Sequence, residues 1–261
     1  MGTSQSKPTA RGGSPLIPSW GEKDPPPPDG DTPPSPPPEQ EQLESNRTAG
    51  FRTALGRFYR SGDGDEARRA LGHYSRKSFG GGGAAGRRFA RAAVSGGAAI
   101  SALSMAAAGQ TPPFGFDVAT LAGRPVDEAI DAIVDAFCPP GILDEDGIRA
   151  AMAEALAEIL QGVDTFDPQA LDPAAILMCM RAFVAELVFQ AVMSEEGEAK
   201  NGVSPLQAVQ RENDIRALVR DTTDREATPI LQNTQGPLSP KQVEGLVGAI
   251  LTEVGKELAS W

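Results

Sequence analysis

The sequence has 261 residues and a net charge of −11, and it contains 40% hydrophobic but only 5% aromatic residues, with two cysteines and one histidine. Because Cys138 and Cys179 are isolated from each other, no disulfide framework is possible, and we expect a reducing, cytoplasmic setting. Cysteine and histidine are too few for a zinc site, and any triad hydrolase would have to use His73. We therefore expect a protein without enzymatic activity and without a cofactor.

Charge and proline divide the chain into three segments. Residues 1–46 carry three basic and seven acidic side chains and hold twelve of the 23 prolines. Residues 47–91 carry eleven Lys and Arg against three Asp and Glu, a net charge of +8, and residues 92–261 have a net charge of −15. This pattern predicts a disordered proline-rich arm (1–42), a basic helical connector (43–91) and an acidic body.

The arm contains a stretch, residues 24–40, that reads DPPPPDGDTPPSPPPEQ and has no apolar periodicity. Proline blocks helix formation, so this stretch predicts an extended, polyproline-like tether of about 3.1 Å per residue. Leu16, Ile17 and Trp20 lie inside this otherwise polar segment. Because Trp is a common interface anchor, we interpret them as a docking motif, with an incidental apolar patch as the alternative.

The N-terminus is the second feature of the arm. Gly2 follows Met1, and removal of Met1 would expose a glycine α-amine, whose reference pKa of about 7.7–8.0 leaves part of it nucleophilic near neutral pH. Residues 1–6, MGTSQS, also match the pattern for N-myristoylation, so a lipidated peripheral adapter is one alternative and an ordinary disordered start is another.

The connector is predicted to form two helices, over residues 43–60 and 65–78, as a basic helical hairpin. Its cations alternate with aromatic residues, which leaves three interpretations open: contact with an acidic protein, nucleic-acid binding through phosphates and stacking, or buried aromatics with solvated arginines. The residues predicted to contact a partner here are Arg57, Arg60, Arg68, Arg69, His73, Tyr74, Arg76 and Lys77.

The body is predicted to be an all-α bundle of about five or six helices, because alternating β-branched runs are absent. Residues 92–116 carry no charge and are rich in Ala and Gly, which favours a buried helix over a membrane span. Arg181 and Glu186 are predicted to form a buried pair. The further helices are predicted over residues 125–137, 144–161, 173–194 (the central helix), 205–222 and 240–260.

Four motifs follow one another along the first third of the chain: MGTSQS (1–6), SPLIPSW (14–20), ALGRFYRSGDGDEARRALGHYSRKSF (54–79) and Arg87-Arg88-Phe89. Their order resembles the QatB family, the small protein of Qat, a four-component bacterial anti-phage defence system. The resemblance is close over the arm and the connector, and over the body it is one of architecture only.

This resemblance implies three companions: an ATPase, a QueC-like enzyme and a TatD-like nuclease. QueC enzymes use ATP to activate a 7-deazaguanine carboxylate, which ammonia then attacks. We expect the α-amine of Gly2 to replace ammonia, so that a deazaguanine base becomes attached to the N-terminus of this chain. Thr3 and Ser4 would suit a narrow channel, the docking motif would anchor the arm, and the catalytic groups would lie on the partner. Contact with the ATPase stays open, and no membrane is expected.

Overall fold

The computed structural model describes residues 39–80, 84–113, 115–138 and 143–261. These residues are mostly helical, and no strand is assigned among them. The predicted all-α fold is therefore confirmed. Most of the predicted arm precedes the first described residue and so lies outside the described part of the chain.

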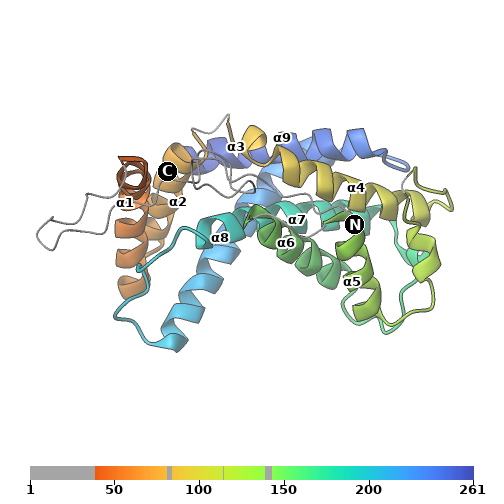
Figure 1. Cartoon of the computed structure of the whole chain (residues 1–261), viewed down its shortest axis with the longest axis horizontal. Helices are drawn as coiled ribbons and strands as arrows, with labels where there is room; N and C mark the ends of the chain where they lie inside the picture. The colour runs from red at the N-terminus through yellow and green to blue at the C-terminus, as the bar shows by residue number, and fades with distance from the viewer. Residues whose placement is uncertain (1–38, 81–83, 114, 139–142) are drawn as a thin grey trace, which may run out of the picture. The chain divides into compact units, whose positions relative to one another are not determined.

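The described residues form nine α-helices and two short 3-10 helices (Figure 1). Six of the α-helices, α4 to α9, belong to the predicted body, in agreement with the expected bundle of about five or six. The elements are α1 (Glu39–Ser61), α2 (Gly64–Ser78), α3 (Ala85–Arg88), α4 (Ala90–Ala107), η2 (Val118–Leu121), α5 (Val126–Phe137), α6 (Leu143–Ile159), η3 (Pro168–Ala170), α7 (Pro173–Met193), α8 (Pro205–Leu231) and α9 (Pro240–Ser260).

Helices α1 and α2 form the predicted hairpin. The side chain of Asp63 accepts a hydrogen bond from the backbone N–H of Asp65 at 2.9 Å and so caps the start of α2. The apolar faces of the two helices meet through aromatic side chains, and the ring centroids of Phe51 and Tyr74 lie 5.2 Å apart. Both predicted helices are confirmed, although α1 begins four residues earlier than expected.

The hairpin and the body share one hydrophobic core. A single cluster of buried side chains extends from Phe51 in α1 to Leu258 in α9, and residues 40–261 form one compact unit. Helix α2 packs on α9, and α3 also contacts α9. The basic and acidic segments therefore differ in composition but are joined by common packing.

Helix α4 is the buried small-residue helix expected from residues 92–116. It packs along α9, and the two helices lie side by side in Figure 1. A Cβ atom added at Gly96 would clash with the ring of Phe183 in α7, so only glycine allows this close approach. The small residues thus bring helices close together inside the protein, as expected.

Helix α7 is the central helix, as predicted. It contacts α4, α6, α8 and α9, and its most extensive partner is α6. Asp172 caps its first turn by accepting from the N–H of Ala175 at 2.7 Å. Among the described helices α7 alone has the length and hydropathy of a membrane span, with a mean hydropathy of 1.8, and 67% of that window is buried against other helices. Such burial is typical of a core helix.

The predicted end of α8 at residue 222 is wrong, because the helix continues to Leu231. The hydroxyls of Thr222 and Thr223 donate to the carbonyl oxygens one turn earlier, so these β-branched residues fit inside the helix. Pro229 is also tolerated within it. Packing of α8 against α7 and α9 thus outweighs the weak helix propensity of this stretch.

Candidate functional site

Two hydrogen bonds fix the hairpin to the body. The Tyr74 hydroxyl donates to the carbonyl oxygen of Ala191 in α7 at 2.6 Å. One residue further on, the Ser75 hydroxyl donates to the carbonyl oxygen of Gly255 in α9 at 2.7 Å, and this bond is buried. Because these bonds attach neighbouring residues of α2 to two different helices, the opposite face of α2 has a fixed orientation relative to the body.

Part of the positive charge of α2 is compensated within the helix. Arg68 pairs with Asp65 at 3.5 Å, and Arg69 pairs with Glu66 at 2.6 Å, each three residues apart. Both arginines remain about half exposed. Exposed ion pairs of this kind contribute little to the free energy of folding. These arginines can therefore leave Asp65 and Glu66 and pair with carboxylates of a partner protein at little energetic cost.

Other cations of the hairpin have no such compensation. Arg57, Arg60 and Lys77 are exposed, and none of them forms an ion pair or hydrogen bond within the described part of the chain. Arg76 donates to the carbonyl oxygen of Ala259 at 2.7 Å and pairs with no Asp or Glu side chain among the residues that the structure describes. We call the following set the hairpin surface: Arg57, Arg60, Arg68, Arg69, His73, Arg76 and Lys77.

Three cations of α2 lie close enough to His73 to affect its pKa. Its pKa is lowered from the ordinary value by burial, and further by the positive charges of Arg76, Arg69 and Lys77. The imidazole is therefore neutral at pH 7 and adds no charge of its own. Arg69, Arg76 and Lys77 therefore surround His73 on one side of α2, as their helical spacing in the sequence predicts.

Tyr74 does not belong to this surface, and its prediction as a partner contact needs correction. Its side chain is fully buried, and its hydroxyl is used inside the protein. The other aromatic residues of the connector are also core residues, so they offer no exposed ring for base stacking, which weakens the nucleic-acid interpretation. The exposed fractions are 1% for Phe51, Phe58 and Tyr59, 0% for Tyr74 and 2% for Phe79.

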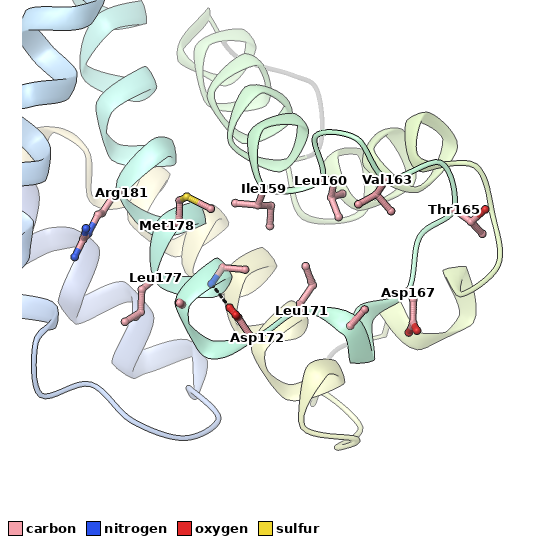
Figure 2. Close-up of a pocket in the computed structure, with 13 residues that line it drawn as sticks. Ile159, Leu160, Val163, Thr165, Asp167, Leu171, Asp172, Leu177, Met178 and Arg181 are labelled. Atoms are coloured by element: carbon pink, nitrogen blue, oxygen red, sulfur yellow. Dashed lines mark hydrogen bonds between the residues drawn. The ribbon is translucent and has the colours of Figure 1, made fainter.

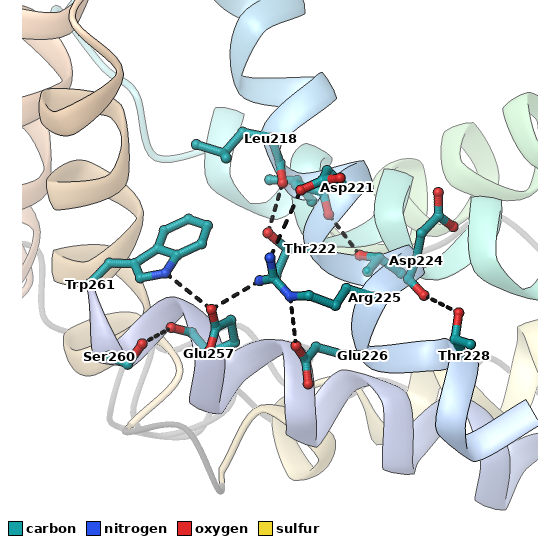
Figure 3. Close-up of polar contacts among 12 residues, drawn as sticks. Leu218, Asp221, Thr222, Asp224, Arg225, Glu226, Thr228, Glu257, Ser260 and Trp261 are labelled. Carbon is teal, nitrogen blue, oxygen red and sulfur yellow. Dashed lines mark hydrogen bonds and ion pairs between the residues drawn. The ribbon is translucent and has the colours of Figure 1, made fainter.

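A chain of contacts leads from Arg68 of the hairpin surface to α9 and α8, and Figure 3 shows the part of it around Trp261, Glu257 and Arg225. The guanidinium of Arg68 lies 5.9 Å from the ring centroid of Trp261. The indole N–H of Trp261 donates to Glu257 at 3.3 Å, and Glu257 pairs with Arg225 of α8 at 2.9 Å. These contacts link Arg68 of α2, through Trp261 and Glu257, to Arg225 of α8.

The predicted N-terminal sites lie outside the described residues. They are the modification site Gly2, its neighbours Thr3 and Ser4, and the docking residues Leu16, Ile17 and Trp20.

An apolar cavity of about 560 Å³ at the start of α7 was not predicted from the sequence (Figure 2). Ile159 and Met178 reach toward each other from α6 and α7, and Leu160 and Val163 lie on the α6 side. A second cavity of about 150 Å³ also has Leu171 and Leu177 in its lining, so the two cavities are neighbours. We call the larger cavity the α7 groove and define it by Ile159, Leu160, Val163, Leu171, Leu177 and Met178.

Sequence reasoning missed the groove for a physical reason. The periodicity of α7 is apolar nearly all round, which predicts a helix covered on every side. Met178 is nevertheless 44% exposed, as is Val163 in the turn after α6. The sequence contained the apolar residues but no signal for the side of α7 that its neighbours leave uncovered.

The predicted pair of Arg181 and Glu186 is not formed, because Glu186 has other partners. Its carboxylate accepts from Gln190 at 2.8 Å and pairs with Arg216 of α8 at 3.3 Å. Arg216 also lies over the ring of Phe189, 4.4 Å from its centroid. Burial raises the pKa of Glu186, although Gln190 and Arg216 oppose the shift. This polar cluster joins α7 to α8.

The cysteines are placed for packing and not for reactivity. Burial raises the pKa of Cys138 to about 11 and that of Cys179 to about 12, so both thiols are protonated near neutral pH. Within the described ranges, no group of three or more His, Cys, Asp or Glu side chains could hold a metal ion.

Comparison with known proteins gives a family but no characterised relative. No curated protein and no solved structure matches the chain. A family model described as QatB, Qat anti-phage system associated protein, matches residues 80–256. The match covers the helical body, so of the motifs that suggested the resemblance only Arg87-Arg88-Phe89 falls inside it. Since more than half of the chain is matched, the chain belongs to the QatB family and is a component of the Qat anti-phage defence system.

Proposed function

We propose that this chain is a non-enzymatic partner and substrate protein, which presents Gly2, after removal of Met1, to a QueC-like ATP-dependent enzyme of the same system. Membership of a defence system with several components supports a role that depends on other proteins. The single observation that carries the contact is the cluster of cations around His73, on a hairpin held rigidly by the body.

The proposed reaction forms an amide bond. ATP activates the carboxylate of a 7-deazaguanine as an acyl nucleotide on the enzyme, and the unprotonated α-amine of Gly2 attacks the carbonyl carbon. The C–N bond forms, the nucleotide leaves with the electron pair of the C–O bond, and the nitrogen loses one proton. The catalytic groups belong to the enzyme, and this chain supplies only the nucleophile.

The hairpin surface acts in this proposal as the docking site. The arm joins α1 at Glu39, so the tether that carries Gly2 starts from the same hairpin that would hold the partner. Binding at one point raises the effective concentration of the second reactive group. Long-range attraction between the cations and an acidic surface of the enzyme also speeds their encounter, in a cytoplasmic setting of moderate salt.

The test is intact-mass analysis of the chain produced with and without the QueC-like enzyme. We expect the mass of a deazaguanine amide at Gly2 in the wild type and its loss in Gly2→Pro, whose secondary amine fits a narrow site poorly. A fatty acyl mass, or an unmodified Gly2 in the presence of an active enzyme, would overturn the proposal.

A second arm of this experiment examines the docking surface. Arg57→Glu combined with Lys77→Glu should slow conjugation roughly tenfold at low salt and less at high salt, because exposed charges are screened. These cations have no partner to lose within the described chain, so the fold should be unaffected. Arg124→Glu, at an exposed arginine outside the hairpin, is the matched control and should conjugate normally.

A further inference from the structure

The α7 groove concentrates apolar surface that the fold leaves uncovered. Five large apolar side chains are exposed among the described residues, and two of them, Val163 and Met178, line this groove. Single exposed apolar side chains are ordinary, but a contiguous patch around a cavity marks an interaction site. Met178 adds an adaptable side chain that can follow the shape of a partner.

The groove also has enough volume for several side chains. It measures about 560 Å³, and a neighbouring cavity of about 150 Å³ lies on the other side of Leu171 and Leu177. A cavity of this size accommodates a short peptide segment with two or three apolar anchors. Such anchors, in well-packed pockets, carry most of the binding energy of protein interfaces.

The charged residues at the edge of the groove determine which residues can stand next to the apolar anchors in the bound segment. Asp167 and Asp172 line it, and their side chains accept the backbone N–H bonds that cap η3 and α7. Arg181 is the only cation among the residues that line the larger cavity, and Figure 2 shows its guanidinium directed away from Ile159 and Val163. The surrounding segment, residues 92–261, has a net charge of −15. An apolar floor with an acidic edge fits an apolar segment with basic neighbours.

We propose that the α7 groove binds a short apolar segment, flanked by lysine or arginine, of another protein of the Qat system. The groove lies within the residues that the family model matches. The inference rests on the proposed role as a partner protein, but it is independent of the N-terminal modification. The two surfaces therefore make separate contacts, one through cations on the hairpin and one through apolar side chains beside α7.

The test measures binding of the purified full-length chain to each of the other purified proteins of the system. Met178→Glu should weaken binding to one of them roughly tenfold, because it removes an apolar surface on which the anchors of the bound segment pack. Met178→Lys should weaken it further, because a positive charge also repels the basic flanks. Val209→Glu is the matched control, since Val209 is 54% exposed on α8, away from the groove, and it should bind as the wild type does.

A photo-crosslinking residue at position 178 identifies the occupant in the assembled complex. A crosslink to an apolar segment with neighbouring Lys or Arg supports the proposal. Binding that Met178→Lys leaves unchanged, or a crosslink only to a second copy of this chain, would overturn it. Normal binding with an unmodified Gly2 would contradict the proposed function alone, and normal conjugation with an unoccupied groove would contradict this inference alone.

Discussion

The hairpin surface and the α7 groove differ in nearly every physical property, although they belong to one compact unit. The hairpin surface presents cations above buried aromatic rings, whereas the groove presents apolar side chains with acidic residues at its edge. Charges on the first act over about 10 Å and weaken with salt, while apolar contact at the second needs close approach and tolerates salt. The comparison indicates that one helical unit can engage two chemically different partners, or two parts of one partner.

The shared core makes this comparison physically meaningful. The hairpin is bonded to α7 through Tyr74 and to α9 through Ser75, and the groove lies at the opposite end of α7, near its first turns. Tyr74 bonds to Ala191, close to the last residue of the same helix. A substitution at one surface would affect the other through α7 and the helices packed on it. The coupling between the two surfaces can therefore be measured as a change in the free energy of unfolding.

The largest expected effect comes from Phe51→Ala. Phe51 is 1% exposed and packs on Tyr74, and a buried Phe→Ala change costs about 3–5 kcal/mol of unfolding free energy. Urea denaturation should be followed by circular dichroism and by Trp261 fluorescence, in a Trp20→Phe background. We expect a single transition at lower urea by both probes, because hairpin and body share one core.

The control for this prediction is Arg57→Ala, which should change the unfolding free energy by no more than about 0.5 kcal/mol. Two separate transitions in Phe51→Ala, with the hairpin melting first, would break the comparison, since the two surfaces would then belong to independently folding parts.

A smaller effect is expected where α4 approaches α7. In Gly96→Ala the new methyl group meets the buried ring of Phe183, and overpacking of this kind costs about 1–3 kcal/mol. Gly245→Ala is the matched control, because Gly245 is an exposed glycine of α9 with nothing near its Cβ position. There the alanine should stabilise the helix by about 0.5–1 kcal/mol. Thermal unfolding of both variants measures the contrast, and equal shifts in the same direction would refute the close contact.

The features that could be predicted from the sequence are those that depend on neighbouring residues in the chain. Helix caps are local, so Asp172 and the Ser-Pro pairs before α8 and α9 predicted the starts of three helices correctly. The exposed cations of the hairpin also followed from helical spacing. Tyr74 was misplaced because the same periodicity does not reveal whether another helix covers the face on which it lies.

The parts that the sequence did not predict depend on contacts between distant segments. The end of α8 was missed because packing, and not propensity, sustains residues after Thr222. The α7 groove arises where α6, the turn after it and η3 diverge from α7, which no single segment encodes. Glu186 found Arg216, thirty positions further along the chain, in preference to the nearby Arg181 for the same reason.

The smallest expected effect concerns the polar cluster between the two surfaces. Burial raises the pKa of Glu186 above its ordinary value, so the folded state favours the protonated carboxyl relative to the unfolded state. The stability that this group contributes is fully present below the ordinary pKa of Glu and is lost as the pH rises through the raised value. Glu186→Gln keeps an oxygen that accepts from Gln190 and Arg216 but carries no charge. The variant should therefore gain unfolding free energy over the wild type as the pH rises from about 4 to about 8. Urea titrations across this range measure the difference, with the exposed Glu253→Gln of α9 as control. A difference that stays constant with pH would mean that Arg216 compensates the buried charge completely, and that the cluster stabilises the α7–α8 contact at all pH values.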